Sequence, residues 1–226
     1  MVQPRENKSA WWIKDSYSEE EIGDLVKWGL DHFWMQNHQM ADLVTPDGYN
    51  IMTRGEGNYV YDIQGRKYID GMAGLFLKNI GHRWPEIAHA VSEQMTTLAY
   101  ANSGAYSSVP GILLAKKISD LAPGELTRTF FCGGGSEAVE IAVKLARQYQ
   151  FITGNTSKTK IISRRGQYHG STSTAMTIGS RGSRTSGMFE PFQPNAIQVD
   201  PPYCYRCPWG FESRSNQDCC MLSVKS

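Results

Sequence analysis

The chain lacks a long hydrophobic run, a net charge of one sign and an apolar leader. No window of about 18 apolar residues predicts a transmembrane helix. The 23 Lys and Arg nearly balance the 22 Asp and Glu, and a net charge of +1 creates no strong field toward nucleic acid or anionic lipid. Residues 1–9 are polar and glutamates follow at 19–21, which argues against a secretory signal or transit peptide. We therefore expect a cytoplasmic protein that binds neither membrane nor nucleic acid.

Cysteine is also scarce, with five residues in the chain. An odd number without a secretion signal argues against a disulfide framework. Cys204 and Cys207 form a C-x-x-C pair that a zinc site can use, but the following Cys219 and Cys220 are adjacent and unsuited to ligating one metal together. We expect unligated thiols and no metal site.

The remaining composition, 40% hydrophobic and 20% charged, is typical of a folded globular protein. Ser18 with Glu21 predicts a capping box at the start of a helix. Turn residues between short runs rich in Tyr, Val and Ile predict a β-meander over residues 47–69. Hydrophobic periodicity then predicts helices over 85–100 and 110–121.

A strand, a turn and a helix are predicted in succession near the middle of the chain. Residues 127–132 are β-prone, residues 133–136 read Gly-Gly-Gly-Ser, and apolar residues at helical spacing follow from Ala138 to Tyr149. Further strands are predicted over 158–163 and 196–200. Strands that alternate with helices indicate an α/β domain with a mostly parallel sheet.

The glycine turn at 133–136 is a candidate anion site. Glycines allow successive N–H groups to converge, and the start of a helix adds unpaired N–H groups and a favourable dipole. A plain flexible turn with Ser136 as the helix cap is the alternative, and both interpretations stay open on this feature alone. The turn matches neither a P-loop nor the Rossmann G-x-G-x-x-G spacing, so nucleotide binding is disfavoured.

Three blocks in order resemble the class III aminotransferases, which depend on pyridoxal 5'-phosphate (PLP). They are Asp62–Phe76 followed by Gly81-His82, Phe130–Arg147, and Gly166–Gly170. The resemblance implies a fold type I large domain that binds PLP at a homodimer interface. It divides the chain into an N-terminal helix and meander (1–75), a partial PLP-binding domain (76–210) and an irregular tail (211–226).

The resemblance also implies roles for individual residues. Gly134, Gly135 and Ser136 hold the PLP phosphate, Tyr168 stacks on the pyridine ring, and His169 organises the site. Trp34, Leu75 and Phe76 line the substrate pocket; ordinary core packing is the alternative for these three and for Tyr168. A member of the family moves an amino group from an amine or amino acid to a 2-oxo acid. Two alternatives remain: a racemase or mutase of the same fold, and a non-catalytic truncated isoform or pseudoenzyme that pairs with a full-length subunit.

The Schiff-base lysine of the family, and the carboxylate that pairs with the pyridinium nitrogen, fall downstream of Ser226. No lysine matches the required position, including Lys144, Lys158, Lys160 and Lys225. We therefore expect the N-terminal half of an aminotransferase that does not transaminate alone. In the family's sheet the strands at 127–132 and 158–163 are not neighbours, so we also expect unpaired strand edges and exposed apolar surface.

Overall fold

The computed structural model describes residues 13–14, 16–36, 38–45, 48–179, 188–190, 192 and 195–208. They fall into two compact units, an N-terminal unit up to Ser108 and a C-terminal unit from Val109. The tail 211–226, with Cys219, Cys220 and Lys225, lies outside the described residues. The division at residues 75 and 210 that the resemblance implies stays a prediction.

The N-terminal unit combines helices with a three-stranded antiparallel meander. Its elements are α1 (Glu19–His32), η1 (Met40–Val44), β1 (Met52–Glu56), β2 (Tyr59–Asp62), β3 (Lys67–Ile69), α2 (Ala73–Phe76) and α3 (Pro85–Thr97). The predicted capping box is confirmed: the Glu21 N–H donates to Ser18 Oγ at 3.2 Å, and the Ser18 N–H donates to the Glu21 carboxylate at 3.0 Å. The meander and the helix beginning at Pro85 are confirmed as well.

Asp62 fixes the turn between β2 and β3. Its buried carboxylate accepts hydrogen bonds from the Arg66 N–H at 2.8 Å, Arg66 Nε at 2.6 Å and the Tyr68 hydroxyl at 2.9 Å. Burial acts to raise the pKa of Asp62, but these donors outweigh it and hold the pKa below its ordinary value. The D-x-x-G-x-x-Y pattern therefore has a local structural function at this turn.

The residues labelled α2 form a left-handed turn. Ala73, Gly74, Leu75 and Phe76 have φ values of 49°, 58°, 62° and 69°. Left-handed backbone costs about 1–2 kcal/mol for each residue other than glycine, so surrounding contacts must hold this turn. Asp70 provides one such contact: its Oδ1 accepts the Gly74 N–H at 3.0 Å, while its Oδ2 lies 2.9 Å from His82 Nε2.

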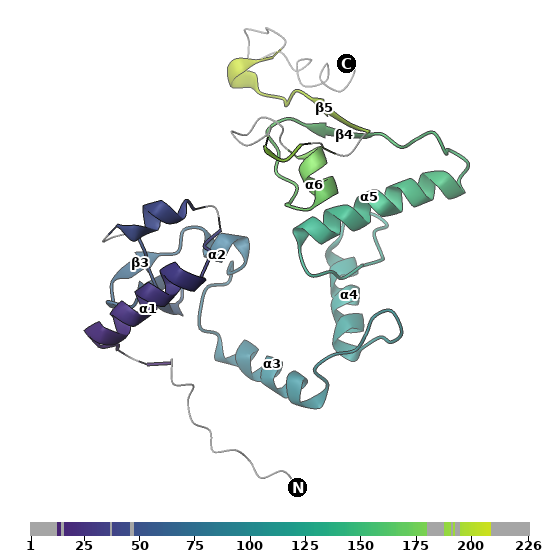
Figure 1. Ribbon diagram of the computed structural model, residues 1–226. Helices are drawn as coiled ribbons and strands as arrows, with labels where there is room; N and C mark the ends of the chain where they lie inside the picture. The colour runs from purple at the N-terminus through teal and green to yellow at the C-terminus, as the bar shows by residue number, and fades with distance from the viewer. Residues whose placement is uncertain are drawn as a thin grey trace. The chain divides into compact units, whose positions relative to one another are not determined.

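The C-terminal unit is built from α4 (Val109–Leu121), α5 (Gly135–Ile152), β4 (Ile161–Arg164), α6 (Ser173–Ile178), β5 (Ala196–Val199) and the short η3 (Cys204–Arg206). Strands β4 and β5 pair in parallel, with Ile161 opposite Ala196 and Arg164 opposite Val199. Figure 1 shows α6 beside these strands and next to α5. The α/β class with a parallel sheet is thus confirmed.

Two local predictions differ from the structure. Residues 127–132 are not a strand, because among the described residues no backbone hydrogen bond joins them to a neighbouring strand. β-prone side chains do not make a strand without a partner to complete the ladder. Helix α6 was missed, because its sequence Ser-Thr-Ala-Met-Thr-Ile has no apolar helical period.

Few apolar side chains are shielded from water in the described ranges. The buried hydrophobic residues there are Leu43, Ile63, Val143, Ala175 and Ile178. Large apolar residues of α4 stay exposed, including Ile112 at 57%, Leu113 at 64% and Leu121 at 75%. Across the described helices, none combines the length and hydrophobicity required to cross a bilayer.

Candidate functional site

The N-terminus of α5 presents unpaired backbone donors. Gly134 is the N-cap in an extended conformation, and the first backbone bond of the helix runs from the Ala138 N–H to the Gly134 carbonyl at 3.0 Å. The N–H groups of Gly135, Ser136 and Glu137 precede this bond and have no partner within the helix. Together with the helix dipole they form an arrangement suited to an anion.

Glu137 modifies this helix end in a way that the sequence did not reveal. Its Oε2 accepts a hydrogen bond from the Gly133 N–H at 2.6 Å. The protein itself therefore uses the Gly133 amide, and the donors that remain for a ligand lie further along the turn. The assignment of the phosphate contact to Gly134, Gly135 and Ser136 stays a prediction.

A chain of hydrogen bonds ties Tyr168 to the same helix end. The Ser171 N–H donates to Ser136 Oγ at 3.0 Å, and the Tyr168 hydroxyl lies 3.1 Å from Ser171 Oγ. Because a serine hydroxyl accepts and donates at once, Ser136 retains its own proton for a ligand. Residues 35 positions apart are thereby joined at one point.

Gly170 makes this close approach possible. Its φ is +133°, and a Cβ at this position would lie 2.4 Å from Ser136 Oγ and 2.9 Å from Ser136 Cα. Any other residue would combine backbone strain with a clash. The glycine of the Tyr-His-Gly block is therefore needed for the loop to rest on the first turn of α5.

The loop and the helix end line a shared, open hollow of about 380 Å³. Its lining residues are Gly135, Ser136, Val139, Tyr168, His169 and Gly170. This volume lies within the range of small-molecule sites. The Tyr168 side chain is 81% exposed, so its flat face is available to a ligand. Amide donors, a hydroxyl and an open aromatic ring fit a phosphorylated aromatic cofactor such as PLP.

The structure brings four of the predicted cofactor residues into this hollow: Gly135, Ser136, Tyr168 and His169. Gly134, the N-cap of α5, adjoins them in the chain. Trp34, Leu75 and Phe76 belong to the N-terminal unit, where their side chains are 82%, 62% and 72% exposed. Their assignment to a substrate pocket stays a prediction.

Glu140 is a residue that sequence reasoning missed. It lies one helical turn after Ser136, and its Oε1 accepts the Thr174 N–H at 2.9 Å. Hydrogen bonding to the Thr174 side chain lowers the pKa of Glu140 most strongly, and the Thr174 and Ala175 N–H groups add to this against the opposing effect of burial. The i, i+4 spacing of Ser136 and Glu140 on a helix was the available signal.

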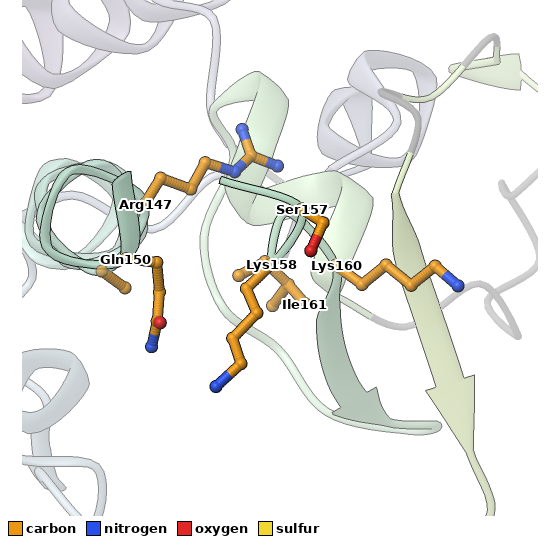
Figure 2. Close-up of a pocket in the computed structure, with 7 residues that line it drawn as sticks. Arg147, Gln150, Ser157, Lys158, Lys160 and Ile161 are labelled. Atoms are coloured by element: carbon orange, nitrogen blue, oxygen red, sulfur yellow. The ribbon is translucent and has the colours of Figure 1, made fainter. Parts of the chain in front are cut away.

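Among the residues that the structure describes, no lysine lines the Ser136–Tyr168 hollow. Lys158 and Lys160 line a different one, between α5 and the start of β4, together with Arg147 and Gln150. Figure 2 shows the two lysine side chains extending in different directions, while Arg147 Nη2 donates to the Thr159 carbonyl at 3.4 Å. These cations do not converge on one point, so this second hollow is a weaker candidate for an anion.

Comparison with known proteins gives concordant results. The sequence model of the family described as aminotransferase class-III matches residues 44–225. Adenosylmethionine-8-amino-7-oxononanoate aminotransferase from Methanocaldococcus jannaschii is 39% identical over 186 residues, which are 82% of this chain and 40% of the relative. Putrescine–pyruvate aminotransferase from Pseudomonas aeruginosa is 35% identical over 160 residues, or 70% of this chain and 35% of the relative.

Solved structures agree with the sequence matches. An (S)-enantioselective omega-transaminase from Thermomicrobium roseum superposes with a TM-score of 0.82 at 32% identity, covering 94% of this chain and 45% of that one. The M. jannaschii enzyme superposes with a TM-score of 0.75 at 37% identity, covering 80% of this chain and 41% of that one. The chain spans about two fifths of the length of the curated relatives it matches.

Proposed function

We propose, from the premise that this chain belongs to the class-III aminotransferases, that it supplies the phosphate and ring contacts of a PLP-dependent transaminase. The reaction is transfer of an amino group from an amine or amino acid to a 2-oxo acid. A second copy of the protein is the expected partner. Relatives of the chain carry names of this reaction class, with several different substrates among them.

Each residue of the hollow has a task in this proposal. The N–H groups of Gly135 and Ser136, with the Ser136 hydroxyl, hold the phosphate at the positive end of α5. The face of Tyr168 packs on the pyridine ring and excludes water from one side of it. His169 lies beside the ring and helps to fix its position. When bound, PLP acts as the electron sink of the reaction.

The observation that carries the proposal is the hydrogen-bonded link from Tyr168 through Ser171 to Ser136. It places an exposed aromatic ring beside unpaired helix amides in a hollow of suitable size. A plain structural turn requires no open aromatic ring next to it. A site for a phosphorylated aromatic compound requires both features.

The test is a comparison of pyridoxamine 5'-phosphate with pyridoxamine as non-covalent probes, because neither forms an imine with surface lysines. We expect the phosphorylated probe to bind at least about tenfold more tightly, since charge-assisted hydrogen bonds to the phosphate are each worth about 1.5–3 kcal/mol. Equilibrium dialysis or fluorescence titration measures both affinities.

A matched pair of variants locates the effect. Ser136→Ala should remove most of the preference for the phosphorylated probe, whereas Ser157→Ala, at the other hollow, should leave it unchanged. Equal affinity of the two probes for the unmodified chain, or equal behaviour of the two variants, would overturn the proposed function.

A further inference from the structure

The Tyr168 loop meets α5 at a second point beyond the hollow. Thr174 lies in the first turn of α6, and its N–H donates to Glu140 Oε1 at 2.9 Å. Thr174 and Ala175 are both buried and Glu140 is half-buried, so this contact is partly shielded from water. A carboxylate at a helix N-terminus satisfies N–H groups that have no partner within the helix.

The two points of attachment are four residues apart on α5 and three residues apart on the segment that it holds. Ser136 and Glu140 are four residues apart on α5, one turn of the helix, and they accept from Ser171 and Thr174. Tyr168 lies three residues before Ser171 and bonds to its hydroxyl. The Glu140 contact lies one helical turn from the Ser136 contact and restricts rotation of the loop about it.

Glu140 is not among the residues that line the hollow. On the basis of the proposed function, we propose that Glu140 is a positioning residue which, through Thr174, holds the 168–174 segment so that the Tyr168 ring stays over the cofactor ring. Glu140 itself touches neither the phosphate nor the ring. We expect its effect to fall mainly on the aromatic contact, because the amide donors for the phosphate, at Gly135 and Ser136, belong to the backbone of α5 itself.

Because Glu140 acts on the aromatic contact and the amide donors hold the phosphate, loss of Glu140 should change the affinities for two probes differently. In Glu140→Ala, affinity for pyridoxamine 5'-phosphate should fall about three- to tenfold, the range expected for loss of an aromatic stacking contact. Affinity for inorganic phosphate, measured on the same protein by competition or ³¹P NMR, should change by less than about twofold. If Glu140 had a merely structural role, the variant would bind both probes more weakly by the same factor.

Two further variants complete the series. Glu140→Gln retains a carbonyl acceptor for the Thr174 N–H and should recover most of the affinity lost in Glu140→Ala. Gln148→Ala, an exposed change on the same helix, should behave like the unmodified chain. Far-UV circular dichroism checks that every variant retains its helices.

Amide hydrogen exchange without any cofactor separates this proposal from the proposed function. Glu140→Ala should speed exchange at Ser171 and Thr174, and Glu140→Gln should restore protection. The positioning role is overturned if amide exchange is unchanged in Glu140→Ala. It is also overturned if this variant loses affinity for pyridoxamine 5'-phosphate and for inorganic phosphate to the same extent. If the unmodified chain binds neither probe while exchange responds as expected, the proposed function fails and the Glu140 clamp on the loop stands.

Discussion

At the scale of single residues, Gly170 has a defined steric task. Alanine here would have to adopt a φ of +133° and place its Cβ 2.4 Å from Ser136 Oγ. We expect Gly170→Ala to displace the loop, to weaken binding of pyridoxamine 5'-phosphate about tenfold or more, and to destabilise the C-terminal unit by about 2 kcal/mol. Ligand titration measures the change in affinity, and amide hydrogen exchange within the C-terminal unit measures the loss of stability.

Gly154→Ala is the matched control. Gly154 also has a left-handed backbone, with a φ of +85°, but nothing lies within 4 Å of the Cβ that alanine would add. The Gly154→Ala variant should lose stability through backbone strain alone and keep its affinity for pyridoxamine 5'-phosphate. If the two variants bind the probe equally well, contact between the loop and Ser136 does not matter for the site.

At the scale of elements, the left-handed turn at residues 73–76 depends on Asp70. The Asp70 carboxylate accepts the Gly74 N–H and pairs with His82, and these hydrogen bonds lower its pKa, the Gly74 bond more than the His82 pair. We expect Asp70→Ala to speed exchange of the Gly74 amide about tenfold or more, because the strained turn loses its acceptor. Hydrogen exchange of the 70–78 segment provides the measurement.

The carboxamide of Asp70→Asn keeps an oxygen for the Gly74 N–H and should preserve most of the protection. Glu56→Gln changes a nearby exposed carboxylate whose contacts are with Arg54 and Arg83, and it should have no effect on this amide. Fast exchange in the unmodified chain, equal to that of Asp70→Ala, would show that Asp70 does not hold the turn.

Elements specified by neighbouring residues were the predictable part of the fold. The capping box of α1 and the meander depend on residues a few positions apart, and both were found from the sequence. The prediction of a strand over residues 127–132 was wrong, because a strand depends on a partner that is distant in sequence. Helix α6 was missed for a related reason: one of its caps is Glu140, 34 positions away.

The candidate site divides in the same way. Gly135, Ser136, Tyr168 and His169 were predicted because the blocks that contain them resemble a known family, and the structure brings them to one hollow. The link through Ser171 and the role of Glu137 were not predicted, because both depend on how side chains meet after the helix and loop have formed.

At the scale of the whole molecule, the exposed apolar surface governs behaviour in solution. Apolar side chains of α4, such as Leu113 and Leu121, are more than half exposed. We expect the chain by itself to bind a hydrophobic dye and to unfold over a broad range of urea with a low m-value, since little apolar surface is newly exposed. A sharp cooperative transition of a soluble monomer would contradict this expectation.

The hydrogen bond from the Gly133 N–H to the Glu137 carboxylate has a consequence for ligand charge. A phosphate that arrives at this helix end meets a resident negative charge as well as the amides. Repulsion between the two anions penalises the dianion more than the monoanion. Dissolved ions screen that repulsion as well as any attraction, so moderate salt opposes phosphate binding here less than it does at a purely cationic site.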